Sequence, residues 1–309
     1  MENRLKPDTS LKIGKLEFKN PVFTASGTFG YNNEYEDFIN VANLGAIVTK
    51  GITLTPKAGN PQPRIKEIPN GMINSIGLEN VGIYEFLEKK LPVLRENNIE
   101  FVLNIAGASI EEYVELARIC KNNNIRAIEL NLSCPNVKSG CLEFGRDEEI
   151  LYRLVSGVRN VYGETLIVKL SSNVSYPEKI AKIVENAGAD AISAINTVKA
   201  ISVSFSEDYK DYKFIKGGMS GNCIKPIALN FIYEIKNHIS IPVIGMGGIT
   251  CLQDMLEFFA VGADAVQVGT ANFTSPDLSE KLVFELEDFM RKYNYNNLQD
   301  MVQNLRNKI

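Results

Sequence analysis

Short apolar runs recur along the chain, and most are followed by a stretch in which apolar residues return every three or four positions. Short runs of this kind are typical of buried strands, whereas the longer spacing is typical of helices that bury one face. The strands expected from the runs are 21–25, 46–50, 101–106, 127–132, 166–170, 191–195, 242–246 and 265–268. The helices expected between them include 110–122, 148–162, 177–186, 226–237 and 251–260.

This alternation predicts parallel strands joined by right-handed crossovers. Eight such units in 309 residues fit an α/β fold of the closed (β/α)8 TIM barrel type, and a doubly wound open sheet is the alternative. A small N-terminal hairpin over 11–18, which turns at Gly14, precedes the first unit. No linker or low-complexity segment interrupts the chain, so we expect one barrel domain over residues 1–309.

Polar residues gather at the carboxyl ends of the expected strands. In a barrel these ends share one face, where active sites are built. Three segments beside that face, 51–77, 135–145 and 198–222, are too long for simple turns and are expected to be lids or binding loops. The pattern therefore predicts an enzyme. The polar strand ends are Ser26-Gly27, Thr49-Lys50, Asn104, Asn131 with Cys134, Lys169 with Ser171, Asn196-Thr197, Gly247-Gly248 and Gly269-Thr270.

Composition narrows the classes of partner. The net charge is −4, so the chain offers no basic excess for nucleic acid. The first residues lack the apolar segment of a signal peptide, and no apolar run reaches the length of a membrane span. The five cysteines show no CxxC spacing, which argues against a disulfide framework and against a zinc site. We therefore expect a cytoplasmic protein without a metal site.

The stretch 128–136 ends in Asn131-Leu132-Ser133-Cys134-Pro135-Asn136, where Pro135 stops the strand. Cys134 is the one group here that could act as a base near neutral pH, because a thiol pKa of ~8.5 falls beside a cation or helix N-terminus. The competing interpretation is a small buried apolar residue. The single histidine, His238, is expected at a polar helix end remote from the strand tips, which excludes histidine acid–base chemistry.

The last two strand ends carry glycines, in Gly245-Met246-Gly247-Gly248 and Gly269-Thr270-Ala271. Glycine lets backbone N–H groups approach an anion, and barrels commonly seat a phosphate here. Tight turns are the alternative explanation.

Lys50 and Lys169 end apolar strands and would point into the barrel mouth, where a cation can stabilise negative charge on a reduced flavin. Lysines that only follow the rim are the alternative.

Asparagines at several strand ends could read a planar, amide-rich ligand through paired donors and acceptors. Capping and turn formation are the alternative, favoured for Asn80 and Asn136. The candidates for ligand binding are Asn74, Asn104, Asn131 and Asn196.

Seven motifs occur in order along the chain. They are Ala25-Ser26-Gly27-Thr28-Phe29-Gly30, Gly59-Asn60-Pro61-Gln62-Pro63-Arg64, Asn74-Ser75-Ile76-Gly77-Leu78-Glu79-Asn80, Asn131-Leu132-Ser133-Cys134-Pro135-Asn136, Ile195-Asn196-Thr197, Gly217-Gly218-Met219-Ser220-Gly221 and Gly245-Met246-Gly247-Gly248. Taken together, these motifs resemble the dihydroorotate dehydrogenase family over nearly the whole chain. The cysteine of the fourth loop is similar to that of the soluble class I enzymes, and the last two glycine loops look most like the NAD-linked B-type catalytic subunit.

The resemblance implies oxidation of dihydroorotate in pyrimidine biosynthesis. Cys134 would take the C5 proton while hydride leaves C6 for N5 of one FMN per chain. The implied FMN contacts are Ser26, Lys50, Gly51, Asn104, Asn131, Lys169, Ile195, Gly221, Gly247, Gly248, Gly269 and Thr270. The implied substrate contacts are Lys50, Asn74, Ser75, Ile76, Gly77, Leu78, Asn131, Asn196 and Thr197.

The subclass also implies an electron-transfer partner. Nothing in the sequence resembles an NAD site or the cysteine quartet of an iron–sulfur cluster, so NAD linkage requires another polypeptide that carries FAD and the cluster. We expect a homodimer within a heterotetramer. A fumarate-linked class I enzyme, which would act alone, is the alternative.

Four features of the sequence depart from the family pattern. Cys141 and Ala200 stand where glycines are expected, Asn222-Cys223 replaces a more usual Pro-Ala, and 204–213 is acidic and tyrosine-rich. None falls on an expected catalytic residue, but they concern the lids and partner contacts.

Other functions remain in competition with this interpretation. A dihydropyrimidine dehydrogenase-like flavoenzyme would use the same Cys-Pro-Asn loop, and a phosphosugar barrel or a non-catalytic barrel would lack flavin. Dihydrouridine synthase-like action on RNA is disfavoured by the charge. A flavin enzyme purifies yellow, which separates it from the colourless alternatives.

Overall fold

The structure is a computed structural model that describes residues 6–31, 34–132, 147–207 and 209–308. Eight parallel strands close into a barrel, which confirms the predicted fold class; the open-sheet alternative is wrong. Around the barrel the strands follow the order β10-β13-β14-β3-β4-β7-β8-β9. They are β3 (Val22–Thr24), β4 (Ala46–Val48), β7 (Phe101–Ile105), β8 (Ala127–Asn131), β9 (Thr165–Lys169), β10 (Ala191–Ala194), β13 (Val243–Met246) and β14 (Ala265–Val268).

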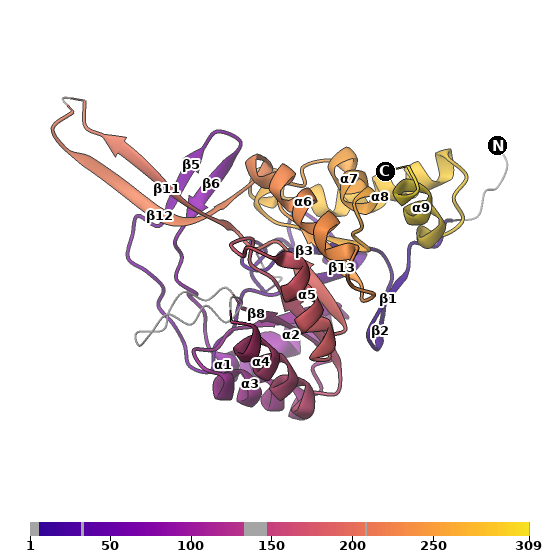
Figure 1. The fold of residues 1–309 in the computed structure, drawn as a ribbon, viewed down its shortest axis with the longest axis horizontal. Coiled ribbons are helices and arrows are strands. Elements are labelled where there is room, and N and C mark those ends of the chain that lie inside the picture. The colour runs from indigo at the N-terminus through magenta and orange to yellow at the C-terminus, as the bar shows by residue number, and fades with distance from the viewer. Residues whose placement is uncertain (1–5, 32–33, 133–146, 208, 309) are drawn as a thin grey trace.

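Helices surround this barrel, and local sequence signals explain where several begin (Figure 1). Ser109 accepts a hydrogen bond from Glu112 N ahead of α3, and Asp147 accepts one from Ile150 N ahead of α4. A proline in the first turn, where its missing N–H is not needed, opens α5 and α6. The helices are α1 (Ile83–Glu85), α2 (Leu91–Glu96), α3 (Ile110–Asn122), α4 (Glu148–Val161), α5 (Pro177–Asn186), α6 (Lys225–Lys236), α7 (Leu252–Ala260), α8 (Leu278–Lys292) and α9 (Leu298–Arg306).

The predicted N-terminal hairpin is present as β1 (Leu11–Ile13) and β2 (Leu16–Phe18), paired antiparallel. Its Ile13, Leu16 and Phe18 pack in one buried cluster with residues of the barrel strands, such as Phe23 and Ile167. A second, larger cluster fills the space between strands and helices. The hairpin therefore closes one end of the barrel interior, and the other end is left for the pocket.

Two of the three segments expected to be loops contain strands. Residues within 51–77 and 198–222 form a four-stranded antiparallel sheet in the order β11-β12-β6-β5. The β11–β12 hairpin extends from this sheet away from the barrel as a long arm (Figure 1). The third segment, 135–145, lies outside the described residues. The strands are β5 (Ile65–Ile68), β6 (Gly71–Asn74), β11 (Val198–Phe205) and β12 (Tyr212–Ser220).

Candidate active site

The interior of the barrel changes from apolar to polar along its axis. Residues two positions apart on a strand point to the same side, and on five strands an interior apolar residue is followed two positions later by a buried polar one. The apolar residues that pack against the β1–β2 hairpin form an apolar plug at one end of the barrel. The polar layer separates this plug from the barrel mouth. The pairs are Val102 and Asn104, Ala127 and Glu129, Ile167 and Lys169, Ala191 and Ser193, and Ala265 and Gln267.

Glu129 is the centre of this polar layer. Its carboxylate accepts hydrogen bonds from Asn104 Nδ2 at 2.6 Å, Ser193 Oγ at 2.6 Å and Gln267 Nε2 at 2.8 Å. Burying a charge is costly unless it is hydrogen-bonded, and these three donors meet that requirement. Two amide oxygens of the layer, Asn104 Oδ1 and Gln267 Oε1, are buried and have no hydrogen-bond partner within the described residues.

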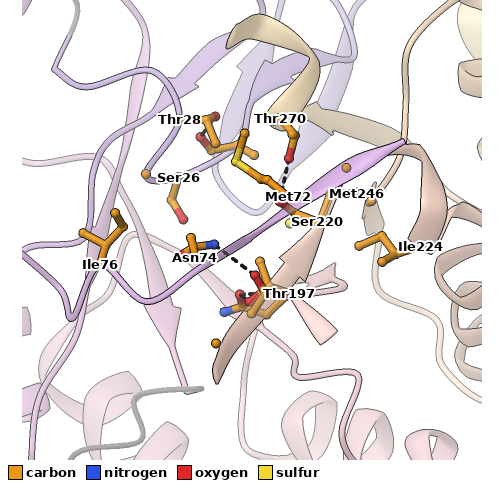
Figure 2. A pocket seen from close by; sticks show the side chains of 18 of the residues that line it. Ser26, Thr28, Met72, Asn74, Ile76, Thr197, Ser220, Ile224, Met246 and Thr270 are labelled. Carbon is orange, nitrogen blue, oxygen red and sulfur yellow. Dashed lines mark hydrogen bonds between the residues drawn. The ribbon is translucent and has the colours of Figure 1, made fainter. Parts of the chain in front are cut away.

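A cavity of about 1130 Å³ opens above the polar layer, at the carboxyl ends of the strands. Ligand pockets usually span ~300–1,000 Å³, so this one has room for a cofactor together with a small substrate. Barrel-strand ends and the four-stranded sheet both contribute to it: in Figure 2, Met72 of β6 lies beside Ser220 of β12 and Thr270 after β14, and Asn74 of β6 lies near Thr197.

Lys169 reaches the cavity from β9 and is buried. Its Nζ donates to Ser26 Oγ at 3.0 Å. Burial lowers the pKa of this ammonium below its usual range, and the charge of Glu129 opposes that effect. Lys169 therefore places its amino group on the wall of a desolvated site, where the electrostatic effect of its charged form on a ligand would be strong.

Lys50 stands at the end of β4 in a wetter environment. Its Nζ lies 4.0 Å from Glu79 Oε2, and the same carboxylate is hydrogen-bonded to Arg64. Since Glu79 is already paired with the arginine, Lys50 keeps positive charge available at the cavity wall. This arrangement suits an anionic group on a ligand.

Two glycines of β12 permit close packing, Gly217 against β6 of the same sheet and Gly218 against Thr197 at the barrel mouth. A Cβ atom on Gly217 would overlap the backbone of Asn74, and one on Gly218 would overlap the side chain of Thr197. Asn74 Nδ2 donates to Gly218 O at 3.2 Å, which joins β6 to β12 (Figure 2). Glycine at these positions lets the sheet form one wall of the cavity.

Amides from the ends of β8 and β10, which are separated by β9, meet at the barrel mouth. Asn196 Nδ2 donates to Asn131 Oδ1 at 3.3 Å, and Asn196 Oδ1 accepts from Thr197 N at 2.7 Å. The backbone oxygen of Asn131 accepts from Tyr113 Oη at 2.5 Å, which fixes the end of β8. Asn131, Asn196 and Thr197 line the cavity.

Comparison with known proteins decides the family. The family model for dihydroorotate dehydrogenase matches residues 9–290. The chain belongs to the dihydroorotate dehydrogenase family. It is 45% identical over 286 residues to the protein of Geobacter metallireducens named dihydroorotate dehydrogenase B (NAD(+)), catalytic subunit. This match covers 92% of this chain and 94% of that protein. Proteins with the same name from Porphyromonas gingivalis and Thermoanaerobacter pseudethanolicus are 44% and 43% identical, and each match covers 96% of this chain and at least 97% of the relative.

In this dihydroorotate dehydrogenase family member, most residues singled out from the sequence line the one cavity. Asn104 and Gly221 are not among its lining residues; Asn104 lies in the polar layer below. Cys134 lies outside the described residues. Those that line the cavity are Ser26, Lys50, Gly51, Asn74, Ser75, Ile76, Gly77, Leu78, Asn131, Lys169, Ile195, Asn196, Thr197, Gly247, Gly248, Gly269 and Thr270.

Two further side chains, His238 and Asn80, lie as the sequence predicted, and a third, Asn222, makes a contact that it did not predict. His238 is exposed after α6, and Asn80 is buried and orders its own loop by accepting from Gly82 N at 2.8 Å. Asn222, a departure from the family pattern, lines the cavity and donates to Gly248 O at 2.9 Å. It therefore braces a glycine loop, a role that its position in the sequence did not indicate.

Sequence reasoning missed Glu129, Gln267 and Ser220. Ser220 accepts from Thr270 Oγ1 at 2.8 Å and so ties the sheet to the end of β14 (Figure 2). Glu129 and Gln267 sit inside apolar strands, where a side chain that could ionise or hydrogen-bond is unexpected. That interruption of an apolar run was the available signal.

Proposed function

We propose that this family member oxidises (S)-dihydroorotate to orotate in pyrimidine biosynthesis, as a single FMN-binding domain over residues 1–309. The observation that carries the proposal is one cavity in which strand-end amides, two lysines and two glycine loops come together. A phosphosugar barrel would explain the glycine loops but not the amides and Lys169.

The described residues fit FMN. Two buried amide oxygens at the floor have no partner among the described residues and would accept from ring N–H groups. Gly247 and Gly248, at φ of +122° and +88°, line the cavity beside Gly269 and Thr270, so the loops after β13 and β14 can present backbone N–H groups to a phosphate. Lys169 would hold its cation near the ring.

Bound FMN would supply the acceptor for the hydride that leaves C6 of the substrate. The chain itself must remove the C5 proton, and we assign this step to Cys134, whose thiolate is the base. Asn74, Asn131, Asn196 and Thr197 would orient the planar ring through paired donors and acceptors. Lys50 would pair with the substrate carboxylate, since Glu79 is already engaged by Arg64.

The relatives are named as catalytic subunits that act with NAD(+). By that similarity we assign this chain the catalytic role in a cytoplasmic complex: a homodimer joined by FAD- and iron–sulfur-containing subunits into a heterotetramer. Among the described residues no helix has the length and apolar character needed to cross a membrane.

Flavin reduction by two related substrates tests the proposed reaction. The purified protein, loaded with FMN and kept anaerobic, is mixed with dihydroorotate or with dihydrouracil, which lacks the carboxylate. We expect dihydroorotate to bleach the flavin absorbance and dihydrouracil to leave it unchanged on the same timescale. Bleaching by dihydrouracil alone would favour the dihydropyrimidine dehydrogenase-like alternative, and a colourless protein that takes up no FMN would contradict the proposal.

A further inference from the structure

Glu129 is a fully buried carboxylate that does not line the cavity. Its three hydrogen-bond donors come from β7, β10 and β14, so with β8 it connects four strands of the barrel. Replacing a buried charge by apolar residues of similar volume is often neutral or stabilising. Fold stability is therefore a weak explanation for a carboxylate at this position.

The hydrogen bonds of Glu129 determine which way two amides face. An ionised carboxylate only accepts, so Asn104 and Gln267 both turn their NH2 groups toward it. Their oxygens consequently point elsewhere, and neither oxygen has a partner within the described residues. With Gln in place of Glu129, at least one neighbour would face an NH2 group and would have to reverse its amide.

Both oxygens lie at the boundary of the cavity. Gln267 is one of its lining residues. Asn104 Oδ1 lies 2.9 Å from the position that a Cβ atom on Gly51 would occupy, and Gly51 also lines the cavity. Gly51, which has no side chain, is therefore the residue that separates this buried oxygen from the cavity.

We propose that Glu129 is a positioning residue, which fixes the Asn104 and Gln267 amides so that the cavity floor offers acceptor oxygens to a ring N–H flanked by carbonyl groups. This inference rests on the proposed function and adds a positioning residue to it. The flavin ring and dihydroorotate both contain such an N–H, so the shared chemistry is recognition of a pyrimidine-dione edge. The negative charge of Glu129 also raises the pKa of Lys169 against the effect of burial.

The test compares Glu129→Gln with a matched control, Ser193→Ala. The control removes one donor to the same carboxylate but keeps its charge and both amides. FMN is titrated into each apo-protein, and orotate into each FMN-loaded protein. In Glu129→Gln we expect the Kd of the ligand that contacts the floor to rise about tenfold, in line with a mispaired buried hydrogen bond; in Ser193→Ala we expect less than a threefold change.

Spectroscopy separates positioning from a general weakening of the fold. The absorption maximum and the midpoint potential of bound FMN should shift in Glu129→Gln and stay constant in Ser193→Ala. Gln267→Met, which removes one oriented amide, should weaken the same ligand and should reduce the further effect of Glu129→Gln in the double variant. If Glu129→Gln fails to fold, Gln267→Met alone carries the test.

Two results would overturn the inference. One is that Glu129→Gln or Gln267→Met binds FMN and orotate as tightly as the parent, with the same flavin spectrum. The other is an equal loss in Ser193→Ala. A parent protein that binds no FMN would instead refute the proposed function on which the inference rests, so the two failures are distinguishable.

Discussion

Cys134 is the side chain on which the proposed proton transfer depends. We expect Cys134→Ala to keep its bound FMN and to lose about 10²–10⁴-fold in the rate of flavin reduction by dihydroorotate, the usual contribution of a general base. Cys134→Ser should recover part of the rate only at raised pH, because an alkoxide forms far less readily than a thiolate. Stopped-flow absorbance measures the rate, and Cys251→Ala, an exposed position, is the control. A parental rate in Cys134→Ala would exclude this residue as the base.

Two other cysteines should differ sharply in reactivity. Cys120 is buried, and desolvation raises the pKa of its thiol from 9.0 to about 12, whereas Cys251 is exposed. Alkylation with iodoacetamide at pH 8, read by peptide mass spectrometry, should label Cys251 in the native protein and Cys120 only after unfolding. Comparable labelling of both cysteines in the native protein would contradict the burial of Cys120.

The same pKa shift has a defined sign for stability. Because the folded state holds the Cys120 proton more tightly than the unfolded state does, its contribution to stability is complete below pH 9. It is lost progressively as pH rises from 9 toward 12. This alkaline loss of stability should be smaller in Cys120→Ala, which has no thiol to ionise.

At the scale of elements, the β11–β12 arm differs from the barrel strands. One face of the arm carries apolar residues on paired positions, Val203 with Phe214 and Phe205 with Tyr212, and Phe205 is 61% exposed. The third strand, β6, pairs with β12 only at Gly218–Ser220. The outer part of the arm is therefore a two-stranded ribbon, which is only marginally stable in water.

This difference predicts fast hydrogen exchange in the outer arm. We expect the amides of Val203 and Phe214 to exchange at least about a hundredfold faster than those of Ile128 and Leu130 in β8, since local opening of the arm exposes little buried surface. Exchange of the purified protein, followed by mass spectrometry, makes the comparison. Protection of the arm equal to that of β8 would show that additional contacts cover it.

The barrel was predictable from sequence because each strand is a short apolar run that pairs with its neighbour along the chain. The helices between the strands were predictable from their amphipathic spacing. The structure shows α3 and α5 at 110–122 and 177–186, the ranges expected from the sequence. The four-stranded sheet was not predictable in this way. β5 is mostly exposed, with two charged residues among its four, and β6 pairs with β12 across more than a hundred residues, so local periodicity cannot show which strands pair.

The candidate site was predictable only as far as its strand ends. Polar residues at the carboxyl ends, such as Lys50 and Asn196, were identified because a barrel brings those ends together. Glu129 and Gln267 were not identified, since their role depends on the partners that meet inside the barrel. Sequence spacing along one strand gives no information about which side chains of other strands lie opposite.

At the scale of the whole molecule, the chain is layered from an apolar plug through a polar floor to an open cavity. The β1–β2 hairpin seals the plug, and the polar layer around Glu129 supports the floor. The sheet containing β6 and β12 adds a wall above the mouth. In the proposed function this cavity receives the substrate, and the electrons taken from it must leave the flavin after each turnover.

The last prediction concerns those electrons. The relatives that are 43–45% identical are named as NAD(+)-linked catalytic subunits, and electron transfer to NAD(+) is assigned here to a second subunit that holds FAD and an iron–sulfur cluster. The purified chain, given dihydroorotate, should therefore reduce artificial dyes but not NAD(+). Addition of the electron-transfer subunit should restore NAD(+) reduction at a rate that saturates at a fixed ratio of the two chains. Cys134→Ala, assayed with the same dyes, controls for reduction that does not pass through the proposed base. Rapid NAD(+) reduction by the chain alone would refute the two-subunit assignment, and efficient reduction of fumarate would instead place this protein with the class I enzymes that act without a partner.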